Sequence, residues 1–184
     1  MSFYGTIKLY IYGCDAMRRG NMAPGKYIGQ VFTEKVEIYE GESTFENCVF
    51  EEGVLVKGNT KSHFLSGEFP SASFKACSFR GENEPSVSLW HFAQCSFVDC
   101  QMFSEKCITL RIDIGAHGTF NNCKIDYIKC AAAIMPEASG DFENCSFRCS
   151  GDAAAGLPAL PIYFDANNKE RTHLVNNTLN GERL

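Results

Sequence analysis

A six-residue segment that recurs along the chain constrains the fold more than any other feature of the sequence. Phe142–Phe147 reads Phe-Glu-Asn-Cys-Ser-Phe, and other segments keep its spacing of apolar residues. The copies that we align are Phe45–Phe50, Phe74–Phe79, Phe92–Phe97, Phe120–Ile125, Phe142–Phe147 and Leu174–Leu179. Their first residues lie 18 to 32 residues apart. Repeats at unequal intervals indicate a solenoid in which insertions form loops while the core stack continues.

The phase of the apolar residues within the repeat predicts a bend. If the first residue is position 0, the apolar residues fall at positions 0, 3 and 5. Positions 3 and 5 share one face of a strand, whereas position 0 does not. A helix would join positions 0 and 3 but would exclude position 5. Position 2 is Asn in four copies, and Asn tolerates the left-handed conformation that a sharp bend needs. The asparagines are Asn47, Asn122, Asn144 and Asn176. We therefore expect two short strands joined at position 2, with positions 0, 3 and 5 facing inward.

The order of apolar residue, Asn bend, small residue and apolar residue over about residues 45–180 resembles the rungs of the pectin-lyase-like superfamily. The resemblance implies an all-β fold, a right-handed parallel β-helix (β-solenoid) of about six to eight rungs, with a rise of about 4.8 Å per rung. Pentapeptide-repeat proteins need an unbroken five-residue period, which these intervals do not show. The resemblance does not specify a function, because this architecture serves enzymes and non-catalytic proteins alike.

The length of 184 residues predicts one domain. We expect residues 1–40 to form an N-terminal cap or atypical first rungs, and residues 41–184 to form the β-helix. Within the first part, residues 6–12 and 31–40 read as strands and residues 13–30 as a loop. Apolar runs after the bends predict a third strand in each rung. These runs are residues 54–56, 87–90, 108–112, 131–135 and 161–164.

The chain contains 10 cysteines, which raises the alternative of a secreted disulfide scaffold. Five of them occupy position 3 of the aligned repeats, where a small inward residue is expected. We therefore interpret them as reduced thiols that pack as small apolar groups, in a cytoplasmic protein. The N-terminal segment lacks the basic and apolar regions of a signal peptide. No 18-residue apolar stretch occurs, so no membrane-spanning helix is expected.

Charge is unevenly distributed around the net value of −5. Residues 1–30 contain four basic residues and one acidic residue, while residues 31–60 contain seven Glu and two Lys. The acidic run is either a solvated outer face or an interaction surface. The candidate interaction residues, which include two from the apolar segment 150–161, are Arg18, Arg19, Lys26, Glu37, Glu40, Glu42, Leu157 and Leu160. The acidic balance argues against nucleic-acid binding and is too small to favour DNA mimicry.

Catalytic and metal motifs are weak in this sequence. No Cys-x-x-Cys pair occurs, and neither a metal nor a cofactor is predicted. Glycoside hydrolysis needs two carboxylates about 5 to 10 Å apart, and Asp113 and Asp126 would lie on neighbouring rungs near His117. Gly115–Gly118 faintly resembles the Gly-His-Gly signature of polygalacturonases, but an Ala is inserted and no Asp pair precedes it. The aspartates are too dispersed for the calcium cluster of a pectate lyase.

These observations favour a non-catalytic β-helix interaction protein that presents a rigid surface to a protein partner. We also expect self-association as a dimer or trimer. By analogy, short β-helices of this kind suit phage-encoded proteins, either an inhibitor of a host system or a small tail component. The alternative is a carbohydrate-active enzyme or a polysaccharide-binding β-helix that uses Asp113, His117 and Asp126 on one flank.

Overall fold

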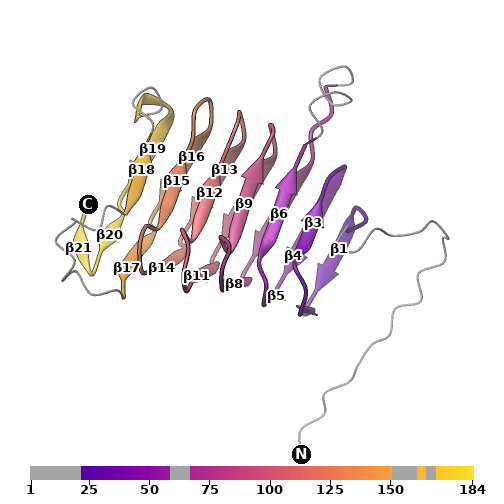
Figure 1. Cartoon of the computed structure of the whole chain (residues 1–184), viewed down its shortest axis with the longest axis horizontal. Helices are drawn as coiled ribbons and strands as arrows, with labels where there is room; N and C mark the ends of the chain where they lie inside the picture. The colour runs from indigo at the N-terminus through magenta and orange to yellow at the C-terminus, as the bar shows by residue number, and fades with distance from the viewer. Residues whose placement is uncertain (1–21, 59–66, 151–160, 165–168) are drawn as a thin grey trace, which may run out of the picture.

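The computed structural model describes residues 22–58, 67–150, 161–164 and 169–184. In this part of the chain the regular structure is β-strand, apart from the short 3-10 helix η2 (Lys169–Arg171). The strands form three sheets, which we call sheets I, II and III and define below. The chain adds one strand to each sheet in that order and then returns to sheet I. Figure 1 shows the strands of successive turns side by side along the long axis of the molecule, from β1 at one end to β20 and β21 at the other.

Sheet I contains β1 (Gly25–Ile28), β4 (Glu42–Glu46), β7 (Ser71–Lys75), β10 (Gln94–Val98), β13 (His117–Asn121), β16 (Ser139–Glu143) and β19 (Thr172–Val175). Sheet II contains β2 (Val31–Phe32), β5 (Val49–Phe50), β8 (Ser78–Gly81), β11 (Gln101–Ser104), β14 (Lys124–Tyr127), β17 (Ser146–Cys149), β20 (Thr178–Leu179) and β21 (Glu182–Arg183). Sheet III contains β3 (Val36–Ile38), β6 (Val54–Lys57), β9 (Val87–Trp90), β12 (Leu110–Ile112), β15 (Ala132–Ile134) and β18 (Ile162–Phe164).

Strands of successive turns pair in parallel, whereas β21 folds back antiparallel onto β20. This arrangement confirms the predicted all-β class and the parallel stacking of the repeats, and it is consistent with a β-helix. The predicted third strands are confirmed as β6, β9, β12, β15 and β18. The loop predicted over residues 13–30 is wrong at its end, because β1 pairs there with β4. Residues 6–12, predicted as a strand, lie outside the described residues.

Left-handed residues join the strands of sheet I to those of sheet II, as the repeat predicts. The four position-2 asparagines have φ values of 53 to 55°. Three equivalent bends use other residues, namely Gly29 (φ 62°), Ala76 (φ 52°) and Asp99 (φ 56°). The bend therefore recurs at every transition from sheet I to sheet II between β1 and β20, and Asn is a preference rather than a requirement.

One copy of the repeat was aligned in the wrong frame. Phe97, not Phe92, pairs with both Phe74 and Phe120 in sheet I. The third copy is therefore Phe97–Met102, with Cys100 at position 3. Phe92 instead has a φ of 64° in the turn that precedes β10. Both frames place a Phe three residues before a Cys, so only the pairing with neighbouring strands distinguishes them.

The core consists of side chains stacked in rows along the coil. At position 0 the rings of consecutive turns lie nearly parallel, with centroids 4.6 to 5.0 Å apart. This row is Tyr27, Phe45, Phe74, Phe97, Phe120 and Phe142. Two residues before position 0, the residues that face inward have small side chains or none. A Cβ on Gly118 would approach the Phe120 ring to 2.8 Å, so the absence of a side chain there makes room for the ring.

Position 3 forms a row of buried thiols, which confirms that the repeated cysteines face inward. The row is Cys48, Cys77, Cys100, Cys123 and Cys145. Each thiol lies near the position-0 carbonyl of the preceding turn, for example Cys145 Sγ at 3.4 Å from the Phe120 carbonyl oxygen. Hydrogen bonding to the neighbouring thiol and burial raise the pKa of Cys77 and Cys123. Cys77 and Cys123 therefore stay protonated and can donate to the carbonyl oxygens of Phe45 and Phe97.

Asn177 takes the position of the cysteine in the last copy. Its Nδ2 donates to the Phe142 carbonyl oxygen at 2.9 Å, and its Oδ1 accepts from the Cys145 amide at 2.8 Å. The side chain is 1% exposed. Its amide thus continues the thiol row with stronger hydrogen bonds, because amide groups are better donors and acceptors than thiols.

Candidate functional site

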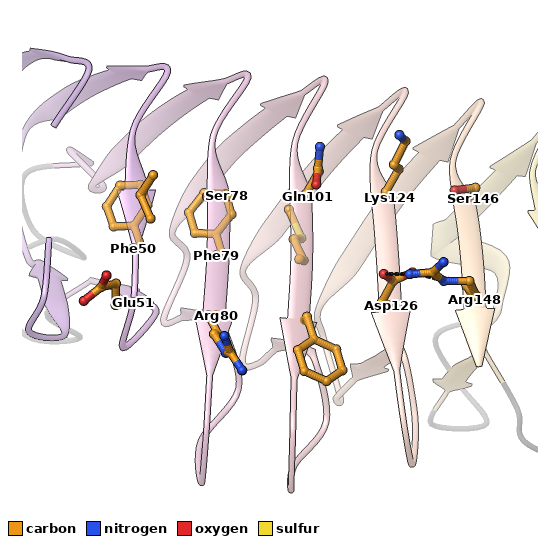
Figure 2. A pocket seen from close by; sticks show the side chains of 13 residues that line it. Phe50, Glu51, Ser78, Phe79, Arg80, Gln101, Lys124, Asp126, Ser146 and Arg148 are labelled. Atoms are coloured by element: carbon orange, nitrogen blue, oxygen red, sulfur yellow. Dashed lines mark hydrogen bonds and ion pairs between the residues drawn. The ribbon is translucent and has the colours of Figure 1, made fainter. Parts of the chain in front are cut away.

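A groove of about 800 Å³ runs across the outer face of sheet II. Strand alternation explains its lining, since every second residue of β8, β11, β14 and β17 faces outward while the residue between them enters the core. The outward residues form two rows across the strands (Figure 2). The first row is Ser78, Gln101, Lys124 and Ser146, and the second row is Arg80, Phe103, Asp126 and Arg148.

Ion pairs hold the charged side chains of the second row. Arg148 forms a fork with Asp126, with Nε at 3.0 Å from Oδ1 and Nη2 at 2.5 Å from Oδ2. Arg80 Nη2 lies 2.5 Å from Glu105 Oε1. These hydrogen bonds raise the pKa of both guanidinium groups. Because both arginines are largely exposed, solvent screens the pairs, and a ligand can replace them at little cost.

The lining of the groove combines donors, acceptors and one aromatic ring. Arg80, Lys124 and Arg148 supply donors, while Asp126 and Gln101 supply acceptors. Phe103 lies between Arg80 and Asp126 in the strand register and is partly exposed. Three cations and two carboxylates line the groove, the second carboxylate being Glu51. Because Arg80 pairs with Glu105 and Arg148 with Asp126, the charges at the groove are nearly balanced.

The three residues of the alternative catalytic prediction lie on different elements. Asp126 is in β14 on the outer face of sheet II, in the groove. His117 begins β13 in sheet I. Asp113 follows β12 at the transition from sheet III to sheet I and is 7% exposed. The structure thus places Asp126 and His117 on separate sheets, and only Asp126 lines the groove.

Both carboxylate oxygens of Asp113 are used in hydrogen bonds within the protein. Its Oδ2 accepts from Arg111 Nη2 at 2.7 Å and from Nε at 3.1 Å, and its Oδ1 accepts from the Ile114 amide. The guanidinium carbon of Arg111 also lies 5.0 Å from the centroid of the Trp90 ring. Asp113 therefore neutralises and orients a cation that stacks on Trp90, on the outer side of sheet III.

His117 contacts two residues that the sequence analysis did not select. Its Nδ1 lies 2.7 Å from Ser139 Oγ, and its Nε2 lies 3.5 Å from Asp141 Oδ2. Ser139 and Asp141 are two residues apart in β16, so both face outward from sheet I. The Ser-x-Asp spacing was visible in the sequence, but its proximity to His117 depends on the pairing of β13 with β16.

The predicted interaction residues are only partly described. Lys26 and Glu42 lie on β1 and β4 of sheet I and are exposed. Glu37 lies on β3 of sheet III and accepts a hydrogen bond from the Tyr39 hydroxyl, while Glu40 is exposed before β4. The remaining four residues, Arg18, Arg19, Leu157 and Leu160, lie outside the described residues. The described members are thus divided between two sheets.

Within residues 22–58, 67–150, 161–164 and 169–184, no three His, Cys, Asp or Glu side chains converge as potential metal ligands. The described residues also contain no helix long and apolar enough to cross a membrane.

Comparison with known proteins gives little information beyond the geometry. No protein-family model matches the sequence, and no match was found among the curated proteins. A solved structure from Parabacteroides merdae ATCC 43184, described as a candidate glycosyl hydrolase, aligns with 88% of this chain and 84% of its own. The two sequences are 9% identical, and the TM-score is 0.44. A likeness at this level carries no argument about activity, so the function must be inferred from the groove and the side chains themselves.

Proposed function

We propose that the protein is a right-handed parallel β-helix that binds an extended polysaccharide along the outer face of sheet II. The observation that carries the proposal is the pair of outward rows that cross β8, β11, β14 and β17 in the groove. Their side chains repeat at the strand separation of about 4.8 Å. That repeat is close to the length of one sugar residue in an extended chain, so successive sugars would meet equivalent positions on successive strands.

The chemistry of the rows suits a ligand rich in hydroxyl groups. Backbone groups within the sheet are already paired between strands, so a ligand on this face contacts side chains. A sugar hydroxyl donates and accepts hydrogen bonds, and the guanidinium groups of Arg80 and Arg148 and the carboxylate of Asp126 supply both partners. The Phe103 ring offers an apolar platform for the face of a sugar ring.

The spacing of the carboxylates supports binding without cleavage in this groove. Glu51 directly follows β5, and Asp126 lies in β14, with β8 and β11 between these strands. Three strand separations amount to about 14 Å. Paired glycosidase carboxylates lie about 5 to 10 Å apart. We therefore propose the groove as a binding surface.

Binding to a polysaccharide panel, measured by affinity electrophoresis and then by calorimetry on the positive glycan, tests this function. Phe103→Ala and Arg148→Ala should each weaken binding about fivefold or more, because each removes a contact worth about 1 kcal/mol or more. Val98→Ala, on the outer face of sheet I, is the matched control and should bind normally. Binding that survives both groove substitutions, or that is lost equally in Val98→Ala, would contradict the assignment.

A second candidate function, self-association, is favoured by the exposure of Leu174 on β19. The residues at its position in the five preceding copies are 0 to 1% exposed, whereas Leu174 is 43% exposed. Val175 beside it is 47% exposed. The outer edge of β19 also carries backbone groups without a further strand in the described sheet. We propose that a second copy covers this end, and that Leu174→Glu converts the resulting oligomer to monomer. A wild-type monomer in sedimentation at tens of micromolar would contradict it.

A further inference from the structure

The outer face of sheet I carries a second group of reactive side chains, separate from the groove of sheet II. Ser139 Oγ lies 2.7 Å from His117 Nδ1, a distance within the range for a hydrogen bond between a nucleophile and its base. The two residues are direct partners in the pairing of β16 with β13. Their side chains are therefore held on the same face by the sheet rather than by a flexible loop.

Asp141 completes an oriented set on the same face. Its Oδ2 lies 3.5 Å from His117 Nε2, and its Oδ1 lies 2.9 Å from His173 Nδ1. A carboxylate beside Nε2 favours the imidazole tautomer that carries its proton on that atom. Nδ1 of His117 then has a free lone pair and accepts the hydrogen bond from the Ser139 hydroxyl. The chain of contacts is nucleophile, base and orienting carboxylate.

A cation lies at the start of β19, the strand that pairs with β16 on the side away from β13. Thr172, the first residue of β19, pairs with Gly140. Arg171 ends the 3-10 helix η2 and immediately precedes Thr172, the first residue of the strand that pairs with β16. Arg171 is exposed, whereas Thr172 faces inward. Arg171 is therefore the cation of the neighbouring turn from which we expect stabilisation of a negatively charged oxygen at Ser139.

We propose that Ser139, His117, Asp141 and Arg171 form a site that hydrolyses esters of short carboxylic acids. Ser139 is the nucleophile, His117 the general base, Asp141 a positioning residue, and Arg171 the group that stabilises the oxyanion. The site lies on an open sheet face beside a shallow hollow of about 270 Å³ lined by Ser96, His117 and Thr119. Because the face is open, the acyl group can be carried on a larger molecule. The small volume of the hollow restricts the acyl chain itself to a short one.

The reaction balances with water as the second substrate. Ser139 Oγ forms a bond to the ester carbonyl carbon while its proton passes to His117 Nδ1, and the carbonyl oxygen becomes an oxyanion near Arg171. The intermediate collapses when the carbon–alkoxy bond breaks and His117 returns the proton to the departing alcohol. Water then attacks the acylated serine, again with His117 as base, and releases the carboxylic acid and free Ser139.

Two measurements on the full chain test the site. A fluorophosphonate probe should form one adduct on Ser139, located by peptide mass spectrometry. Hydrolysis of p-nitrophenyl acetate should fall by about 100-fold or more in Ser139→Ala and His117→Gln, the usual effect of removing a nucleophile or base. Asp141→Asn should lower kcat with little change in KM, because it orients the base without touching the substrate.

Ser150→Ala is the matched control, since Ser150 is exposed after β17 and lines neither the hollow nor the groove. It should leave both labelling and hydrolysis unchanged. All variants are surface substitutions and should melt as the wild type does; if Ser139→Ala does not fold, His117→Gln and the labelled peptide decide the question. Labelling of Ser139 no greater than that of Ser150, or hydrolysis unchanged in His117→Gln, would overturn the proposal.

Discussion

Truncation of Phe97 to Ala tests the stacked core and the corrected frame of the repeat together. Phe97 is 0% exposed, and its ring lies between those of Phe74 and Phe120, with both centroids 4.8 Å away. Removing a buried Phe side chain costs about 3 to 5 kcal/mol from lost burial and the cavity left behind. The two stacked neighbours also lose ring contacts worth about 0.5 to 1.5 kcal/mol each. Because neighbouring strands hold the rings of Phe74 and Phe120 in place, these rings cannot move far into the cavity. We therefore expect a loss in the upper half of the range of about 3 to 5 kcal/mol.

Urea denaturation followed by far-ultraviolet circular dichroism measures this change. The midpoint should fall by more than about 1 M, since the free energy of unfolding changes by about 1 to 3 kcal/mol per molar urea. Phe103→Ala is the matched control, because the same residue type faces outward from sheet II there. It should change the free energy of unfolding by less than about 1 kcal/mol. A loss in Phe97→Ala no larger than that in Phe103→Ala would refute the stacked arrangement.

Three further predictions concern buried thiols and Asn177 at the end of the thiol row. Cys145→Asp should prevent folding, because it places an unpaired charge among buried groups, while Cys145→Ser should fold; normal melting of the Asp variant would refute an inward thiol. Burial raises the pKa of Cys95 to about 12. Thiols of the unfolded chain ionise at lower pH. The contribution of the neutral Cys95 thiol to the free energy of unfolding should therefore be fully present below about pH 8.5 and be lost as the pH rises toward 12. Denaturation at a series of pH values measures this loss. Asn177→Leu should destabilise by at least about 2 kcal/mol, because the Cys145 amide and the Phe142 carbonyl lose their partner; an unchanged melting temperature would contradict this account.

Local patterns in the sequence were sufficient to predict the bends and the inward rows. A left-handed residue at position 2 follows from the change of phase between Phe142 and Cys145, and the structure has φ of 54° at Asn144. The third strands were also recognisable as short apolar runs. The alignment failed at Phe92 because its frame repeats that of Phe97 five residues later. Both frames satisfy the same pattern of apolar residues, and the pairing of Phe97 with Phe74 and Phe120 resolves them.

The candidate sites depended on contacts that no local pattern encodes. Asp113 and Asp126 were grouped because each falls on a separate rung, yet Asp126 lies on sheet II and Asp113 binds Arg111 at a corner. The structure instead brings Ser139 next to His117, 22 residues earlier in the chain. That separation is one full turn of the coil, and its length depends on how many residues each loop adds between strands.

The sequence by itself determined that this chain forms short parallel strands with Phe and Cys rows inside, because alternation and bend preferences act over a few residues. The tertiary structure alone decided which outward side chains meet. A shift of one residue in the register of β16 against β13 would separate Ser139 from His117, although every strand would remain a strand. The groove on sheet II and the Ser139 cluster on sheet I therefore follow from strand register, which is set by the stacking of Phe120 on Phe142 in the core.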